Sequence, residues 1–186
     1  MPDYALFLKC DGNSKKGNFE ENKKPRKPDT RYWDEVRVVA GVVTGQNRRS
    51  NSDARKIELV TPKTGTGDRV YFAVATDPAG TTLLNMSFMC GIHLGVKGNK
   101  ATVASPFRQG GEIQAHLPNS TTFTTIRSWD GVEFQAIGPY TIVRDPSAAD
   151  EECVFHKLTI VATVRSSAGT TREFSYDPDL DIELGL

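Results

Sequence analysis

The residues of this chain that could hold a metal ion form two Cys-x-x-His units, Cys90 with His93 and Cys153 with His156. Two thiolates and two imidazoles make up the ligand set of a structural zinc site. In a β-strand, however, residues three apart project to opposite faces, so a unit meets one ion only if a tight turn lies inside it. Gly91 allows such a turn in the first unit, whereas the second unit lies in the most strand-like stretch of the chain. We therefore predict buried thiols and ordinary strand histidines, with no metal and no cofactor.

Nucleophilic catalysis by a cysteine needs a histidine within reach and a lowered thiol pKa. The chain has three cysteines, of which the first is Cys10, and three histidines, and none lies in a recognisable nucleophile motif. A glycosidase needs two carboxyl groups about 5–10 Å apart in a cleft. Glu151 and Glu152 are a candidate pair, but the sequence does not give the distance between their carboxyl groups or place them in a cleft. Residues 64–68, TGTGD, lack the Gly-Lys-Ser/Thr end of a phosphate-binding loop and indicate a hairpin turn. We predict that the protein is not an enzyme.

Length and composition favour one soluble domain over residues 1–186. The chain is 38% hydrophobic and has a formal net charge of +0, which argues against a protein that coats nucleic acid. An odd number of widely spaced cysteines is typical of reduced thiols in the cytosol. The apolar stretch at residues 4–10 has Asp3 before it and Lys9 inside it, so we expect neither a secretory signal nor a membrane span. The predicted location is the cytoplasm.

Charge is distributed unevenly along the sequence. About half of the 23 basic residues lie in the first third, and residues 173–186 form an acidic tail. Residues 14–31 combine dense charge with two prolines, which predicts an exposed loop. The basic and acidic ends could attract each other, in one chain or between neighbours. The candidates for such a subunit interface are Lys23, Lys24, Arg26, Arg48 and Arg49 against Asp177, Asp179 and Asp181.

Apolar residues alternate with polar ones along most of the chain, and turn residues interrupt them about every ten residues. This pattern is typical of a β-sandwich or β-barrel. The one helix candidate is residues 78–89, where Asp77 would cap the N-terminus and Pro78 would take the first helical position. We predict a mainly β domain with long charged loops, at most one short helix and about ten strands, at residues 4–10, 32–45 with a bend at Gly41, 54–61, 68–76, 100–105, 112–117, 122–129, 132–137, 140–144 and 153–164.

Four stretches of the sequence are similar to one known family. Residues 6–12 read LFLKCDG and are followed by KGN at 16–18, residues 33–38 read WDEVRV and lead to GQ at 45–46, and residues 57–63 read IELVTPK. Residues 134–143 and 154–164 are similar to the two long paired strands that close the β-barrel in that family. Together they resemble the haemolysin-coregulated protein (Hcp) family, the tube subunits of bacterial type VI secretion, which are related in fold to phage tail-tube proteins. The resemblance covers about half of the chain.

This resemblance implies a mechanical function. Copies of the chain would form a hexameric ring, and rings would stack into the inner tube of a contractile injection apparatus with effectors in its lumen. The implied partners are further copies of the chain, a sheath, a spike and effectors, and export from the bacterial cytoplasm would need no signal peptide. We expect no membrane and no nucleic-acid partner. The residues themselves leave open a glycan-binding or capsid-like β-sandwich without catalytic activity.

Overall fold

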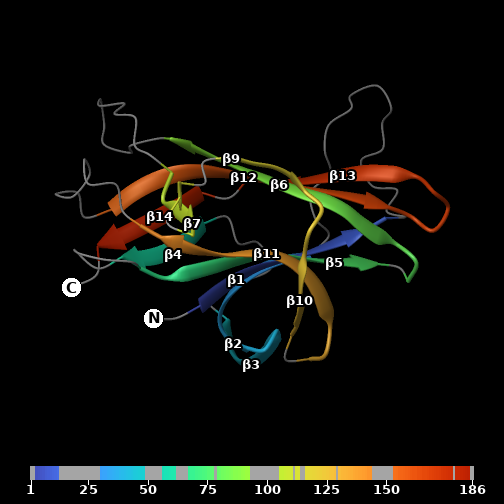
Figure 1. Cartoon of the computed structure of the whole chain (residues 1–186), viewed down its shortest axis with the longest axis horizontal. Helices are drawn as coiled ribbons and strands as arrows, with labels where there is room; N and C mark the ends of the chain where they lie inside the picture. Colours follow the sequence, from blue (N-terminus) through green and yellow to red (C-terminus); the bar gives the residue numbers. More distant parts are fainter. Residues whose placement is uncertain are drawn as a thin grey trace.

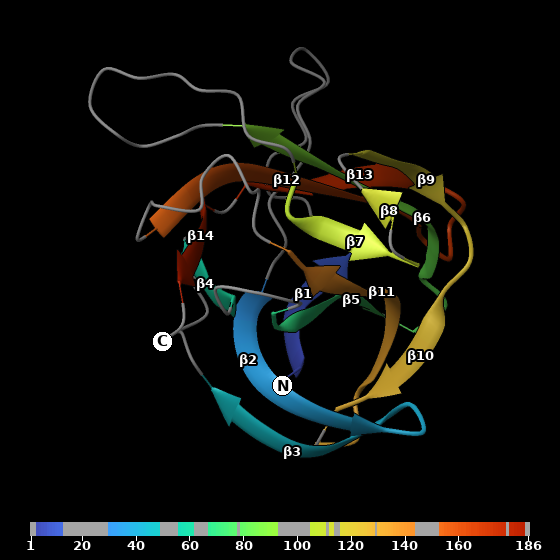
Figure 2. The same cartoon turned by 60° about the vertical axis from the view of Figure 1, so that its left-hand side comes forward.

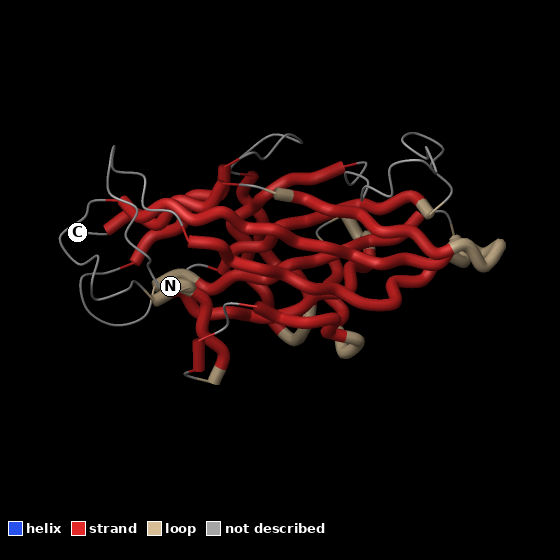
Figure 3. The backbone as a smooth tube through the Cα atoms, turned by 90° about the horizontal axis from the view of Figure 1, so that it is seen from above, coloured by secondary structure: helices blue, strands red, loops and turns tan. Residues whose placement is uncertain are grey.

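The computed structural model describes residues 3–12, 30–48, 56–61, 67–77, 79–92, 105–110, 112–113, 116–128, 130–143, 153–177 and 179–184. Within these residues the chain forms fourteen strands and no helix (Figure 3). The prediction of a mainly β fold is therefore confirmed. Nor does the described part contain any helical segment with the length and apolar character that a membrane crossing requires.

The first sheet closes on itself. Its eight strands follow the order β10-β3-β2-β1-β5-β11-β7-β8, and an additional pairing of β10 with β11 joins the first six strands into a barrel (Figure 2). The strands β1 and β5 are parallel neighbours, as are β3 and β10. Their bounds are β1 Asp3–Asp11, β2 Thr30–Val39, β3 Val42–Arg48, β5 Arg69–Asp77, β7 Phe107–Gln109, β8 Glu112–Ile113, β10 Thr124–Arg127 and β11 Glu133–Ile142.

The second sheet packs against one wall of the barrel. Its six strands follow the order β4-β14-β12-β6-β9, with β13 paired to β12. In Figure 1, β6, β12 and β13 lie above β1, β5 and β11, which in turn lie above β2 and β3. The bounds of this sheet's strands are β4 Lys56–Thr61, β6 Thr82–Ile92, β9 His116–Ser120, β12 Cys153–Arg165, β13 Thr171–Tyr176 and β14 Asp179–Leu184.

The strand β1 is buried on both faces because the barrel and the sandwich share it. Ala5 and Phe7 belong to the cluster inside the barrel, where the ring of Phe7 lies 4.7 Å from that of Phe134 between centroids. Leu6 and Leu8 belong to the larger core cluster between the two sheets. A strand buried on both faces reads as a continuous apolar run, which explains the lack of alternation at residues 4–8.

Four aromatic rings join the two sheets. Phe72 of β5 lies 5.4 Å from Phe88 of β6 and 5.8 Å from Tyr140 of β11, measured between ring centroids. Phe107 of β7 completes the group, at 5.6 Å from Phe72 and 5.4 Å from Phe88. All four side chains are almost fully buried. Such edge-on and tilted arrangements stabilise a core beyond the burial of area alone.

The predicted helix at residues 78–89 is wrong, because residues 82–92 form β6. Leu83 pairs with Val164 and the next paired residue is Asn85, so Leu84 is the extra residue of a β-bulge. A bulge shifts the alternation by one residue, which puts Leu83 and Met86 on the same buried side although they are three apart. That spacing imitates a helix in the sequence.

The stretch at residues 32–45, predicted as one bent strand, is a hairpin. β2 ends at Val39 and β3 begins at Val42, and Ala40 and Gly41 between them have φ angles of 49° and 76°. Two left-handed residues in succession form the tight turn whose twist suits a two-residue hairpin loop. Gly41 is required here, since a Cβ at this position would lie 3.0 Å from the carbonyl oxygen of Thr125.

The stretch predicted as an acidic tail, residues 173–186, is built into the second sheet as far as it is described. β14 lies between β12 and β4, and β13 pairs with β12. Phe174, Tyr176 and Leu180 are buried in the core between the sheets. The acidic residues that interrupt these apolar positions conceal the strand alternation in the sequence.

Other predicted strands have different bounds in the structure. Residues 112–117 contain β8 and the start of β9, residues 122–129 contain the shorter β10, and residues 132–137 with 140–144 merge into β11. β11 changes register between Ile137 and Tyr140, which accounts for the apparent break. Of the predicted loop 14–31, Thr30 and Arg31 begin β2, and residues 14–29 lie outside the described residues, as do 100–104 of the strand predicted at 100–105.

Candidate interaction surface

The wall of the barrel that lies farthest from the second sheet presents an exposed face. Along β3, β10 and β11 the residues Val43, Ile126 and Phe134 are buried in the barrel, so their neighbours in sequence face outward. We call the resulting surface of β2, β3, β10 and β11 the outer barrel face. It consists of Arg37, Val39, Val42, Thr44, Thr125, Arg127, Glu133 and Gln135.

One row of side chains crosses all four strands of the outer barrel face. The register pairs Val39 with Val42, Val42 with Arg127, and Arg127 with Glu133. Val39 and Val42 are 51% and 44% exposed, which is unusual for valines in adjacent strands. The row thus places an apolar pair next to a pair of opposite charges. Such a combination can contact another surface through both apolar and charged groups.

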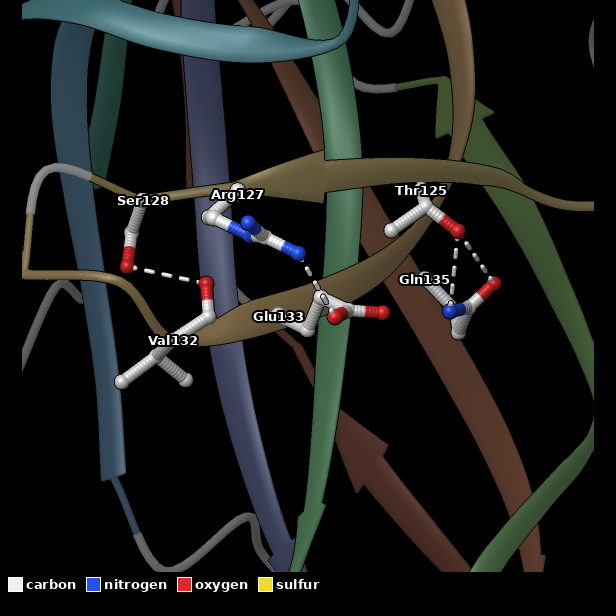
Figure 4. Close-up of polar contacts among 6 residues, drawn as sticks. All are labelled: Thr125, Arg127, Ser128, Val132, Glu133 and Gln135. Atoms are coloured by element: carbon white, nitrogen blue, oxygen red, sulfur yellow. Dashed lines mark hydrogen bonds and ion pairs between the residues drawn. The ribbon is translucent and has the colours of Figure 1, made fainter.

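The charged pair of this row is solvated. Nη2 of Arg127 donates a hydrogen bond to Oε2 of Glu133 at 3.2 Å, and the two side chains are 59% and 56% exposed (Figure 4). Exposed pairs of this kind contribute about 0–1 kcal/mol to stability, because water and salt screen them. Arg127 and Glu133 can therefore exchange partners at little cost to the fold.

Hydrogen bonds hold the β10–β11 hairpin on either side of that pair. The side-chain amide of Gln135 donates to Oγ1 of Thr125 at 3.2 Å, and the Ser128 hydroxyl lies 3.0 Å from the carbonyl oxygen of Val132 (Figure 4). The same hydroxyl contacts the Asp130 carboxylate. This hydrogen bond lowers the pKa of Asp130, against a smaller effect of burial, and backbone hydrogen bonds lower it further. The hairpin presents its outer side chains from a fixed backbone.

The thiol of Cys90 lies in the core and does not have the properties of a nucleophile. It is 4% exposed, and burial raises its pKa from 9.0 to about 12, against a smaller lowering by a hydrogen bond with Ser105. A nucleophilic thiol needs a lowered pKa instead. Cys10 is also a buried free thiol.

Alkaline pH should destabilise the fold through Cys90. Between pH 9 and 12 the unfolded chain has lost the thiol proton and the folded chain retains it, so the free energy of unfolding falls as pH rises. The slope from this group approaches about 1.4 kcal/mol per pH unit. Cys90→Ala should remove this slope, as urea denaturation of both proteins at pH 8.5, 9.5 and 10.5 would measure. Tyr140, whose pKa burial raises to about 12, titrates equally in both proteins. If the free energy of unfolding fell equally with pH in both proteins, the Cys90 thiol would not be buried in the folded protein.

The four residues of the candidate zinc site are only partly described. Cys90 lies in β6, Cys153 and His156 lie in β12, and His93 is outside the described residues. β12 is continuous from Cys153 onward, so no turn separates positions 153 and 156. The part of the chain that the structure describes contains no group of three or more Cys, His, Asp or Glu residues that could hold a metal. The absence of zinc at all four residues stays a prediction.

Of the residues predicted for the subunit interface, four lie in the described part of the chain. Arg48 is the last residue of β3, Asp177 is exposed after β13, and Asp179 and Asp181 lie in β14. In the sheet register, Asp179 pairs with Lys157 of β12 and with Lys56 of β4. The remaining candidates, Lys23, Lys24, Arg26 and Arg49, lie outside the described residues. The ends of β3, β4 and β14 do lie on the same side of the molecule (Figure 2).

The exposed valines of the outer barrel face are missing from the residues predicted from sequence. Their signal is the stretch VVAGVV at residues 38–43, in which a small turn pair separates two apolar pairs. Ala-Gly is a weaker hairpin signal than Asn-Gly or Asp-Gly. The sequence does not show that Val42 faces away from both core clusters. Its pairing with Arg127 of β10 and its exposure in the structure show this.

No protein-family model matches the chain, and no curated protein and no solved structure matches it either.

Proposed function

We propose that this protein is a structural subunit that assembles with copies of itself. The observation that supports self-assembly best is the outer barrel face, where two exposed valines adjoin an exposed ion pair. Exposed apolar side chains that lie together, with polar groups around them, are typical of protein contact surfaces. The chain has a net charge of +0, so copies of it do not repel each other through their overall charge.

Strand edges provide a second means of association. Among the described strands, β8 ends the first sheet, and β4 and β9 end the second. An edge strand has backbone N–H and C=O groups that another chain can pair with. A subunit with edges on both sheets can contact neighbours on more than one side, as a ring that stacks on other rings requires.

The form of assembly that we propose is the inner tube of a contractile injection apparatus. Its support is the resemblance of residues 6–12 and the other quoted stretches to the Hcp family. In this proposal hexameric rings stack through the basic residues around Arg48 and the acidic residues of β14, and the lumen carries effectors. Sheath and spike proteins would be the further partners, and export through the apparatus would need no signal peptide. Catalysis has no part in this function.

Light scattering coupled to size-exclusion chromatography tests this proposal. A ring should have a mass near six times the 20.4 kDa of the chain, and stacked rings should form tubes visible by negative-stain electron microscopy. We expect the assembly to form more readily at low salt than at high salt, because salt screens the attraction between the basic and acidic groups that contribute to stacking. A protein that elutes with the mass of one chain at all concentrations would contradict the proposal and favour a monomeric glycan-binding sandwich.

A further inference from the structure

Within the described residues, the large apolar side chains that are well exposed occupy two opposite faces of the molecule. Val39 and Val42 lie on the outer barrel face, and Met89 of β6, 54% exposed, lies on the outer face of the second sheet. The layer of β1 and β5 separates these faces (Figures 1 and 2). They therefore cannot meet within one chain, but they can meet between two copies.

The tip of the β2–β3 hairpin has an apolar residue at a position whose left-handed backbone conformation usually favours Gly, Asn or Asp. Ala40 has a φ of 49°, a left-handed conformation that Gly, Asn and Asp adopt far more readily than alanine does. With Val38 partly buried and Val39 and Val42 exposed around it, the tip combines small and branched apolar side chains. The conformational cost of Ala40 is an observation independent of the exposed valines. Both indicate a tip that is suited to an apolar contact.

The surface around Met89 can receive such a tip. Met89 pairs with Thr159 of β12, and the next pair on this face is Ser87 with Val161. These neighbours are short and partly buried, whereas Met89 is the long exposed side chain among them. A methionine side chain is flexible and polarizable, so it packs against apolar groups of irregular shape. We call the outer side of β6, β12 and β13 the second-sheet face.

Charges on the two faces are also compatible. The outer barrel face carries Arg127 and Glu133, and the second-sheet face carries the exposed residues Arg165 and Glu173. Arg165 pairs in register with Thr171, and Glu173 pairs with Thr163, so this cation and anion lie on adjacent rows of the sheet. With Arg37, the outer barrel face has two cations and one anion, and the second-sheet face has one of each. Both faces therefore carry charges of both signs, and Arg127 and Arg165 each have a possible partner across the contact.

We infer that the outer barrel face of one copy docks on the second-sheet face of the next copy, with the β2–β3 tip against Met89. This inference rests on the proposed function and names the contact that would build the assembly. The two faces differ, so the contact is head-to-tail. Head-to-tail contacts between identical subunits generate closed rings or open filaments, whereas a contact of one face with itself stops at a dimer.

Three variants of the full chain test this contact by light scattering coupled to chromatography. The barrel-face variant carries Val39→Lys and Val42→Lys, the sheet-face variant carries Met89→Lys, and the control carries Ala168→Lys in the exposed turn after β12. Each change replaces an exposed side chain, and circular dichroism checks that the fold is retained. We expect the control to assemble like the unchanged protein and the other two variants to be monomers. An equal mixture of these two should form dimers, because each supplies the face that the other has lost.

The outcomes separate this contact from the proposed function. If the unchanged protein assembles and both variants keep its mass, the contact lies elsewhere and self-assembly stands. If only the barrel-face variant dissociates, the partner of the outer barrel face is a surface without Met89, and the proposed contact is wrong. A mixture that stays monomeric also overturns it. If the unchanged protein is itself monomeric, the proposed function fails together with this contact.

Discussion

Replacing Phe72 with alanine should lower the free energy of unfolding by about 3–5 kcal/mol. The Phe72 side chain is 0% exposed, and its ring lies within 6 Å of three others, at 5.4 Å from Phe88, 5.6 Å from Phe107 and 5.8 Å from Tyr140. Its removal loses the transfer free energy of the ring and leaves a cavity. These neighbours belong to both sheets, so they cannot all move inward to fill it. Urea denaturation followed by circular dichroism measures the change.

Two further variants make this measurement decisive. Phe72→Leu fills part of the cavity and should cost about half as much as Phe72→Ala. Thr121→Ala changes an exposed residue outside both contact faces and should cost less than about 1 kcal/mol. A loss below about 1 kcal/mol for Phe72→Ala would show that the two sheets do not pack through this residue in solution.

Alternation of apolar and polar residues is sufficient to predict most of the large strands. The pattern at residues 153–164 corresponds to β12, and residues 68–76 correspond closely to β5. Both strands pair along much of their length, so the local pattern and the long-range pairing agree. In β1 the continuous apolar run predicts a strand but not its two-sided burial. That burial depends on the sheet that packs above it.

Bulges and turns account for the main errors. A single extra residue, Leu84, gives β6 an apparent helical spacing, and Pro78 with Asp77 adds the start signal of a helix. The β2–β3 hairpin turns at Ala40, a residue that rarely takes a left-handed conformation, so the sequence predicts a bend instead. Closure of the barrel depends on β10 pairing with both β3 and β11, which no local pattern contains.

The candidate contact surface was harder to predict than the fold. Charge runs in the sequence direct attention to residues such as Lys23 and Asp179, since charges are visible without a structure. The sequence does not distinguish an exposed valine from a buried one, because the pairing of the strand decides which face the valine lies on. Val42 and Val43 are neighbours in sequence, yet one is 44% exposed and the other 3%. The sequence therefore predicts apolar content at this hairpin, and the structure assigns it to two different faces.

At the end of the barrel where β1 and β5 begin, the buried carboxylate of Asp3 forms an ion pair with the partly exposed Arg69. These residues are partners in the parallel register. Nε and Nη2 of Arg69 donate hydrogen bonds to the two carboxylate oxygens of Asp3, at 2.6 and 2.8 Å. The side chain of Asp3 is 8% exposed, whereas that of Arg69 is 45% exposed. The hydrogen bond with Asp3 raises the pKa of Arg69, and burial, together with the charge of Asp3, raises the pKa of Tyr71 beside them.

We expect Arg69→Met to lower the free energy of unfolding by about 2 kcal/mol at neutral pH, less than for a fully buried pair because Arg69 is partly exposed. Methionine keeps much of the length of the arginine stem but leaves the Asp3 carboxylate buried without its charged partner. The double variant Asp3→Asn with Arg69→Met should lose less than Arg69→Met alone, because it removes the buried charge as well. Urea denaturation of the four proteins of this cycle gives the coupling energy between the two residues.

The matched control is the exposed pair of the outer barrel face. Arg127→Met removes the same functional group from a pair whose side chains are 59% and 56% exposed in one chain, and should cost less than about 1 kcal/mol at protein concentrations where the chain is monomeric. The difference between the two arginines therefore measures the burial of the carboxylate rather than the loss of a guanidinium. Equal costs for Arg69→Met and Arg127→Met would mean that water reaches Asp3, and that the barrel is open at the end where β1 and β5 begin.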